Sequence, residues 1–272
     1  RTWELIELSS GSSVEPVIIT INQPILYRKL AEKFNGKGVV VNLHVPDRTR
    51  LTVQRSMSFD EIADDAASLV KYAYPGRKLV ILGLCVNGLV ALKIAEKLVL
   101  SGLEAPGVVM IDSWHLAKVG RLPPVSSYLK KWVQRGRRWA YQFKQYQSGR
   151  IGFADLMKKN SLLNKVFRKL NIADTALEDE EFIVDLIYHL AERCRHHEFR
   201  SYKGGILLFR SEKFSDNENF EWGAALRVEQ SNHILRGWHE EALSGTGITK
   251  MARIIESRFL MQSTPYYLDA AE

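Results

Sequence analysis

Short apolar runs alternate with amphipathic stretches along the first 112 residues of the chain. Strands are expected at 17–21, 38–43, 79–82 and 107–111, and helices at 27–34, at 58–73 and in a stretch that ends near Leu100. Apolar runs without alternation are typical of strands in a parallel sheet that is covered on both faces. Strands and helices that alternate at these spacings predict an α/β fold with a doubly wound, mostly parallel sheet.

The helix expected at 58–73 carries signals for both of its ends. Ser58 suits the position that caps the first turn, and Glu61 three residues later suits a capping box. Pro75 and Gly76 follow the helix and are typical of its end.

The alternation of strands and helices breaks after Asp112. Residues 115–200 contain no convincing strand and have the pattern of helices. Strands are expected again at 205–209 and 225–228, and a final amphipathic helix at 249–260. We therefore expect a core formed by residues 1–114 and 201–272, with a helical lid inserted at 115–200.

Charge is distributed unevenly between this lid and the rest of the chain. Between His115 and Ile172 there are 14 Lys or Arg residues and one acidic residue, Asp155, which gives +13. Subtracting that from the whole-chain charge of +7 leaves −6 for the remainder. Six basic residues share one face of a helix expected at 126–147, opposite an aromatic stripe: Lys130, Lys131, Arg135, Arg137, Arg138 and Lys144. A solvated helix face is the ordinary explanation, and docking of an acidic partner is the functional one.

Composition excludes several classes of protein. The apolar runs are too short to span a bilayer, so stable membrane insertion is not expected, and no nucleic-acid-binding module is recognisable. The chain begins at Arg1 without a leader, so we expect a domain cut from a longer protein. Two cysteines, Cys85 and Cys194, are too few for a disulfide framework and lack metal-ligand spacing. This favours a reducing, cytoplasmic compartment.

The segment 83–88 (GLCVNG) joins an expected strand to an expected helix. It resembles the nucleophile elbow Gly-x-Ser-x-Gly, with Cys85 at the apex and Asn87 in place of the second glycine. The apex lies at a helix N-terminus, which favours an anion, and the thiolate is the nucleophilic form of cysteine. The alternative is that Cys85 is a small buried apolar residue.

Two further residues complete a candidate Cys-His-Asp triad in the chain order of α/β-hydrolases. Asp112 ends the strand after the elbow, although an aspartate there can also be a turn former or a helix cap. His233 is expected in a polar loop after the last strand, and His239 is the second choice.

These residues resemble the thioesterase domains of nonribosomal peptide and polyketide synthases. The resemblance is carried by residues 58–63, 83–91, 109–113, 202–210 and 221–223, and by His233. It implies an α/β-hydrolase fold with Cys85 as nucleophile, Asp112 as acid and His233 as base. Most members have serine at the apex, and some have cysteine.

The oxyanion hole is the part of the family pattern from which this sequence departs. The backbone N–H of Val86 is expected to be the first donor. The second is expected from the backbone of Asn22, in a loop that lacks the glycine usual in the family.

The resemblance implies release of an acyl or peptidyl chain from a carrier-protein thioester through an acyl-Cys85 intermediate, by hydrolysis or by intramolecular cyclisation. No cofactor is expected to bind directly, because a phosphopantetheine arm of the carrier presents the substrate. The acidic carrier is expected to dock on the basic lid. The alternatives are a free-standing proofreading thioesterase and a non-catalytic protein of this fold that binds a carrier or an acyl ligand, which Asn87 and the loop at Asn22 suggest.

Overall fold

The computed structural model describes residues 1–11, 16–113, 176–195, 197, 199, 202–212, 222, 230–235, 242–243 and 246–260. The chain divides into two compact units, one formed by Arg1–Lys118 and Asp185–Glu272 and the other by Val119–Val184. Most of the lid predicted at 115–200, including its basic helix face, lies outside the described residues, so its bounds stay a prediction. Its described part, α8 (Ala176–Arg195), is helical.

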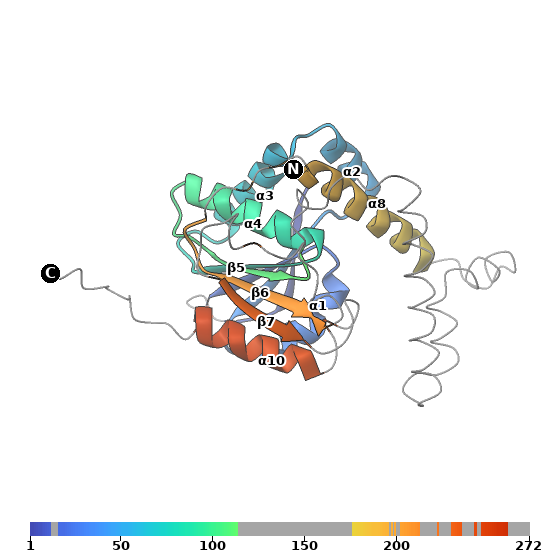
Figure 1. Ribbon diagram of the computed structural model, residues 1–272. Coiled ribbons are helices and arrows are strands. Elements are labelled where there is room, and N and C mark those ends of the chain that lie inside the picture. The colour runs from blue at the N-terminus through green and yellow to red at the C-terminus, as the bar shows by residue number, and fades with distance from the viewer. Residues whose placement is uncertain are drawn as a thin grey trace, which may run out of the picture. The chain divides into compact units, whose positions relative to one another are not determined.

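A seven-stranded sheet forms the first unit (Figure 1). Its strands are β1 (Glu4–Ser9), β2 (Val17–Ile21), β3 (Val39–His44), β4 (Leu79–Leu84), β5 (Gly107–Ile111), β6 (Ile206–Ser211) and β7 (Gln230–Leu235). Their order is β1-β3-β2-β4-β5-β6-β7, and every neighbouring pair is parallel except β1 with β3. The predicted α/β class with a mostly parallel sheet is therefore confirmed.

Two strands differ from the prediction. The sequence predicts no strand before Val17, yet β1 pairs antiparallel with β3 at the edge of the sheet. The strand expected at 225–228 lies outside the described residues, and the structure has a strand that the sequence did not predict, β7, at Gln230–Leu235. This second difference moves a candidate catalytic residue from a loop into a strand.

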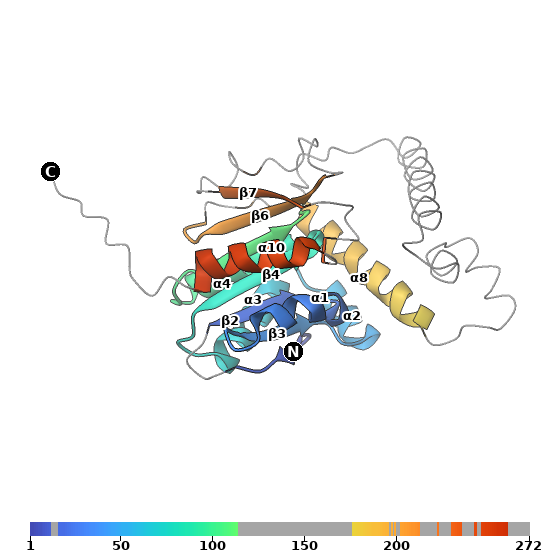
Figure 2. The ribbon, with the colours of Figure 1, turned by 90° about the horizontal axis from the view of Figure 1, so that it is seen from below.

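Helices cover both faces of the sheet. They are α1 (Pro24–Ala31), the short η1 (Glu32–Phe34), α2 (Arg48–Arg55), α3 (Phe59–Ala73), α4 (Val86–Leu100), α10 (Thr246–Ile255) and its π-helical extension η5 (Glu256–Leu260). Figure 2 shows α1 and α10 on the near face of the sheet, with α3 and α4 on the far face. The capping box predicted for α3 is confirmed: the Glu61 N–H donates to Ser58 Oγ at 3.2 Å, and the Ser58 N–H donates to Glu61 Oε2 at 2.7 Å.

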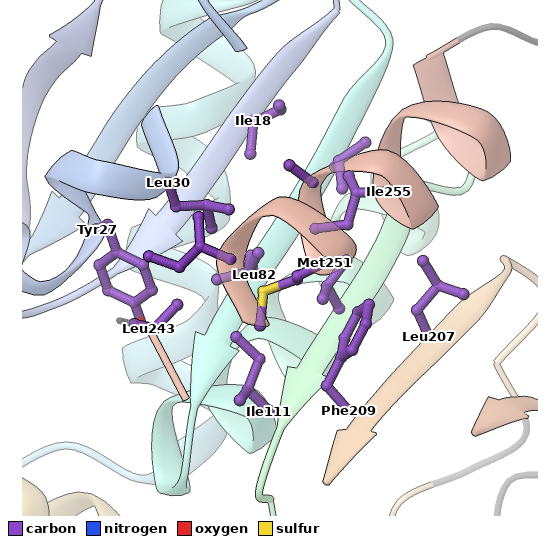
Figure 3. Packing of buried hydrophobic residues seen from close by; sticks show 14 of the residues in the cluster. Ile18, Tyr27, Leu30, Leu82, Ile111, Leu207, Phe209, Leu243, Met251 and Ile255 are labelled. Carbon is purple, nitrogen blue, oxygen red and sulfur yellow. The ribbon is translucent and has the colours of Figure 1, made fainter. Parts of the chain in front are cut away.

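One apolar cluster lies between the sheet and the helices α1 and α10 (Figure 3). Alternate strand residues supply its floor, because successive side chains of a strand point to opposite faces. Leu82, Ile111 and Phe209 come from three adjacent strands, and Met251 and Ile255 of α10 cover them. Full burial of such a side chain contributes about 1.5–3 kcal/mol. This packing holds rigid the central strands whose carboxyl ends carry the candidate site.

No helix in the described part of the chain combines the length and the apolar character that a membrane span requires.

Candidate active site

Cys85 lies at the apex of a tight turn between β4 and α4, as the elbow pattern predicts. Its φ is 57° and its ψ is −128°, a conformation that residues with a side chain rarely adopt. The Cys85 N–H donates to the Ile111 carbonyl at 2.8 Å, which ties the apex to β5. Strain of this kind persists only where the surroundings enforce it, and it is concentrated at functional sites.

Two glycines permit the turn. A Cβ on Gly83 would lie 2.1 Å from the Asn87 carbonyl oxygen, so no other residue fits there without a shift of the backbone. A Cβ on Gly88 would lie 2.0 Å from Ser113 Oγ, two residues beyond the end of β5. The second close approach therefore falls on Gly88, which leaves position 87 free to carry a side chain.

The two cysteines occupy different environments. Both are free, and Cys194 is buried in α8, where burial raises the pKa of its thiol well above the ordinary value. Cys85 is only partly buried and precedes the first turn of α4. The first N–H groups of a helix have no intrahelical acceptor, so they can stabilise negative charge at this position.

Asp112 follows β5 directly and is 1% exposed. Leu84 and Ile111 are register partners, so Cys85 and Asp112 are the next residues along two adjacent parallel strands. The side chain of Asp112 is held by Ser211 of β6, whose N–H donates to Oδ1 at 2.6 Å and whose hydroxyl donates to Oδ2. The carboxylate is thus fixed at the carboxyl edge of the sheet, next to the strand that carries the thiol.

His233 does not lie in a loop, and this prediction is wrong. It lies inside β7, where it pairs with Phe209, and the two rings stack with centroids 5.3 Å apart at 30°. Leu84, Ile111, Phe209 and His233 form one row across the sheet. Three strand spacings, about 14 Å, therefore separate the backbone of His233 from that of Leu84. Burial and the nearby Lys250 lower the pKa of His233 below its usual value of 6.5.

The physical reason is the alternation of side chains along β7. Leu235 is buried in the cluster beneath α10, and His233, two residues earlier, is on the same face of the sheet. The structure therefore does not bring His233 beside Cys85. The second choice, His239, lies four residues beyond the end of β7 and outside the described residues.

The two predicted oxyanion donors differ in availability. Val86 is the first residue of α4, where a backbone N–H has no intrahelical acceptor. The Asn22 N–H already donates to the Leu43 carbonyl at 2.8 Å, as an extension of the pairing of β2 with β3. The geometry therefore does not support Asn22 as a backbone donor to an oxyanion.

A buried amide pair connects the loop after β2 to the elbow, and the sequence analysis did not find it. Asn22 Nδ2 donates to Asn87 Oδ1 at 2.9 Å, and these two residues are 1% and 2% exposed. The only signal in the sequence was Asn87 itself, at a position where the elbow pattern has glycine. Its partner is 65 residues away in the chain, so local pattern could not identify it.

Tyr27 of α1 is a second such residue. The N–H of Leu84, which precedes Cys85, donates to the Tyr27 hydroxyl at 3.1 Å. Burial raises the pKa of Tyr27 well above its usual range, so the phenol stays protonated. Tyr27 therefore fixes the backbone of Leu84, the last residue of β4.

The described residues contain no group of His, Cys, Asp and Glu side chains that could hold a metal ion.

No known protein-family profile matches the chain, and no curated protein matches it in sequence. Solved structures do match. The Vlm2 thioesterase domain is 15% identical, with a TM-score of 0.61 over 96% of this chain and 99% of that one. The NocB thioesterase domain, in a covalent complex with a fluorophosphonate nocardicin G analog, is 14% identical, with a TM-score of 0.55 over 89% and 93%. The fold is the α/β-hydrolase fold.

A third match places the same fold within a longer protein. Holo-AB3403, a four domain nonribosomal peptide synthetase bound to AMP and glycine, is 16% identical with a TM-score of 0.66. The match covers 96% of this chain but only 20% of that one. At such identities the likeness establishes the fold alone.

Proposed function

We propose that this chain is a thioesterase domain that releases an acyl or peptidyl chain from a carrier-protein thioester through an acyl-enzyme on Cys85. The observation that carries the proposal is the pair formed by Cys85, at the apex of a strained elbow, and Asp112, a buried carboxylate at the end of the adjacent strand. The likeness to thioesterase domains supports it.

In the first half of the reaction the catalytic histidine takes the proton of the Cys85 thiol, and the resulting thiolate attacks the carbonyl carbon of the thioester. The negative charge that develops on the carbonyl oxygen accepts a hydrogen bond from the Val86 N–H, and such donors contribute about 3–4 kcal/mol each. When the tetrahedral intermediate collapses, the bond to the carrier sulfur breaks. The carrier thiol leaves with a proton from the catalytic histidine, and the acyl group remains on Cys85.

In the second half the histidine removes a proton from the acceptor, which then attacks the acyl-Cys85 carbonyl. Water gives the free acid, and an amine or hydroxyl of the substrate gives a cyclic product. Collapse of the second tetrahedral intermediate returns the sulfur of Cys85. Asp112 orients the histidine and stabilises its protonated form in both halves.

We further propose that His239 supplies this histidine. The chain leaves β7 at Leu235, at the carboxyl edge of a sheet in which β4, β5, β6 and β7 are parallel. Cys85 and Asp112 follow strands at that same edge. The chain that leads to His239, four residues after Leu235, therefore begins at the edge of the sheet that carries Cys85 and Asp112. His233, in contrast, is two residues inside the strand.

A cysteine nucleophile suits a demanding release step. Transfer from the carrier thiol to Cys85 exchanges one thioester for another, so little driving force is lost. A serine at the apex would hold the acyl group as an oxoester, which is a less reactive donor. The substrate would arrive on the phosphopantetheine arm of the carrier, and the basic segment 115–172 is the proposed docking surface for that acidic partner.

Acylation of Cys85 by a thioester tests the proposal. The unchanged protein should gain one acyl group in intact-mass measurements with the octanoyl thioester of N-acetylcysteamine, and with the same acyl group on a carrier protein. Cys85→Ala should abolish the adduct. Cys194→Ala, which removes the only other cysteine, should retain it.

The opposite result separates the enzyme from a binding protein. If neither substrate acylates the unchanged protein, while the carrier still binds, the chain is a non-catalytic protein of the same fold.

A further inference from the structure

The loop after β2 holds an unusual backbone conformation. Asn22 and Gln23 have φ values of 54° and 49°, so two successive residues with side chains lie in the left-handed region. The loop then enters α1 at Pro24. Thioesterase domains usually have a glycine-bearing turn here, and this chain needs another means of holding the loop.

Asn22 is held by four hydrogen bonds. Its N–H donates to the Leu43 carbonyl at 2.8 Å, and its own carbonyl accepts from Asn42 Nδ2 at 3.0 Å. Its side chain accepts from the Val45 N–H at 3.1 Å and donates to Asn87 Oδ1 at 2.9 Å. Asn42 is fully buried, and Asn22 and Asn87 are almost fully buried. Such bonds are strong in a low-dielectric interior and costly to leave unmade.

The bond that Asn22 donates to Asn87 differs from the other three in what it connects. Leu43, Asn42 and Val45 belong to β3 or to the residue after it, so they tie the loop to the sheet. Asn87 is the second residue of α4, two positions after Cys85. The bond between the two asparagine side chains therefore fixes the loop directly to the turn that carries the thiol.

The same loop also decides which N–H group could face an oxyanion. The Asn22 N–H is committed to Leu43, Pro24 has no N–H, and the Leu26 N–H donates to the Gln23 carbonyl at 3.0 Å. Within the described residues neither the Gln23 N–H nor the Ile25 N–H makes a hydrogen bond, and Gln23 is the one that lies nearer the end of β2. Because β2 and β4 are adjacent parallel strands, Gln23 and Val86 both follow strand ends at one edge of the sheet.

We propose that Asn87 is a positioning residue that acts through Asn22 to hold the Gln23 N–H as the second oxyanion donor. The inference rests on the proposed thioesterase function. It gives Asn87 the role of replacing the missing glycine turn, by clamping the oxyanion loop from the side of the nucleophile.

Two reactions of the same sulfur test this role. Acyl transfer from the octanoyl thioester of N-acetylcysteamine to Cys85 passes through an oxyanion, whereas alkylation of Cys85 by iodoacetamide does not. Asn87→Ala should slow the acylation about 10- to 100-fold, less than the roughly 10²- to 10³-fold loss on removal of an oxyanion donor, because the donor is displaced and not removed. The same variant should be alkylated at a rate within about twofold of the unchanged protein.

A double-mutant cycle tests whether Asn87 acts through Asn22. Asn22→Ala should also slow acylation, and adding Asn87→Ala to it should have almost no further effect, because the partner is already gone. Additive effects of the two substitutions would contradict a shared pathway.

Gln54→Ala is the matched control. Gln54 is a fully buried amide whose Nε2 donates to Thr2 Oγ1 at 2.9 Å, near the β1 edge of the sheet. It should leave the acylation rate close to that of the unchanged protein, with a similar loss of thermal stability.

Three further outcomes would overturn the inference, and they can be told apart. Equal acylation of Asn87→Ala and the unchanged protein removes the positioning role. Equal losses of acylation and alkylation make Asn87 a structural residue of the elbow. An unchanged protein that is alkylated but never acylated contradicts the proposed function itself.

Discussion

The junction of β4 with α4 and the pair β6–β7 both contribute to the candidate site, but they are determined in different ways. At the first, Cys85 and Asp112 lie where the sequence pattern predicts them, after the ends of β4 and β5. At the second, the predicted loop histidine, His233, is a strand residue stacked on Phe209. The two regions share one sheet and differ in how local their constraints are.

The elbow is specified by residues within a few positions of one another. Gly83 must be glycine because a Cβ there would meet the Asn87 backbone, four positions further along the chain. Gly88 has a longer-range reason as well, because a Cβ there would meet the side chain of Ser113. These requirements leave a trace in the sequence as glycines at fixed spacing around the apex. β7 has no such trace, because its pairing with β6 determines where it begins.

The largest effect expected from this comparison separates the two histidines. His239→Ala should lower kcat/KM for a soluble acyl thioester about 10²- to 10⁴-fold, the usual range for a general base. His233→Phe keeps an aromatic ring on Phe209 and should stay within about twofold of the unchanged protein. Steady-state kinetics of both variants measures the contrast. A severe loss in His233→Phe together with an active His239→Ala would return the role to His233.

A smaller loss of activity is expected when the hydrogen bonding of Asp112 by Ser211 is weakened. Ser211→Ala removes the hydroxyl that donates to Asp112 Oδ2 and leaves the N–H bond to Oδ1. We expect kcat to fall about 5- to 20-fold with little change in KM, and the free energy of unfolding to fall by about 1–2 kcal/mol. Ser211→Thr, which retains a hydroxyl, should restore most of kcat.

Ser113→Ala provides the control for that variant. Ser113 is also a buried serine, two residues beyond the end of β5, and its hydroxyl donates to the Ile111 carbonyl at 3.3 Å. A similar loss of kcat in Ser113→Ala would mean that any buried serine at this edge affects activity, and would remove the specific role of Ser211.

The parts of the fold that the sequence predicts are those with a strong local signal. The continuous apolar runs of β2, β4 and β5 and the capping box at Ser58 and Glu61 identify their elements without reference to the rest of the chain. The sequence does not predict β1, because β1 is a partly exposed edge strand with two glutamates. It is held by its antiparallel pairing with β3. The sequence does not predict β7 either, because its first three residues, Gln230–Asn232, are polar.

The candidate site also has a part that the sequence predicts and a part that it does not. Cys85 and Asp112 directly follow strands, and apolar runs in the sequence predict where those strands end. The contacts that support them join distant positions: Asn22 to Asn87, Ser211 to Asp112 and Tyr27 to Leu84 are separated by 65, 99 and 57 residues. Side chains of this kind have no periodicity, and a single sequence offers no rule that pairs them.

The smallest effect expected is a pH dependence of stability at His233. Its pKa is lowered in the folded protein, first by burial and then by Lys250, so the unfolded chain binds more protons than the folded one between the two pKa values. His233 therefore contributes stability that is fully present above about pH 6.5 and is lost as the pH falls through the folded pKa.

His44 and His189 also have lowered pKa values, the latter about 4, so the whole protein should lose stability in acid for several reasons. The share of His233 appears only in a difference: between pH 7 and pH 5 the melting temperature of His233→Phe should fall less than that of the unchanged protein, by about 2 °C or less. Parallel melting curves across that range would mean that His233 has the same proton affinity in both states, and that the environment beneath α10 does not disfavour its charge.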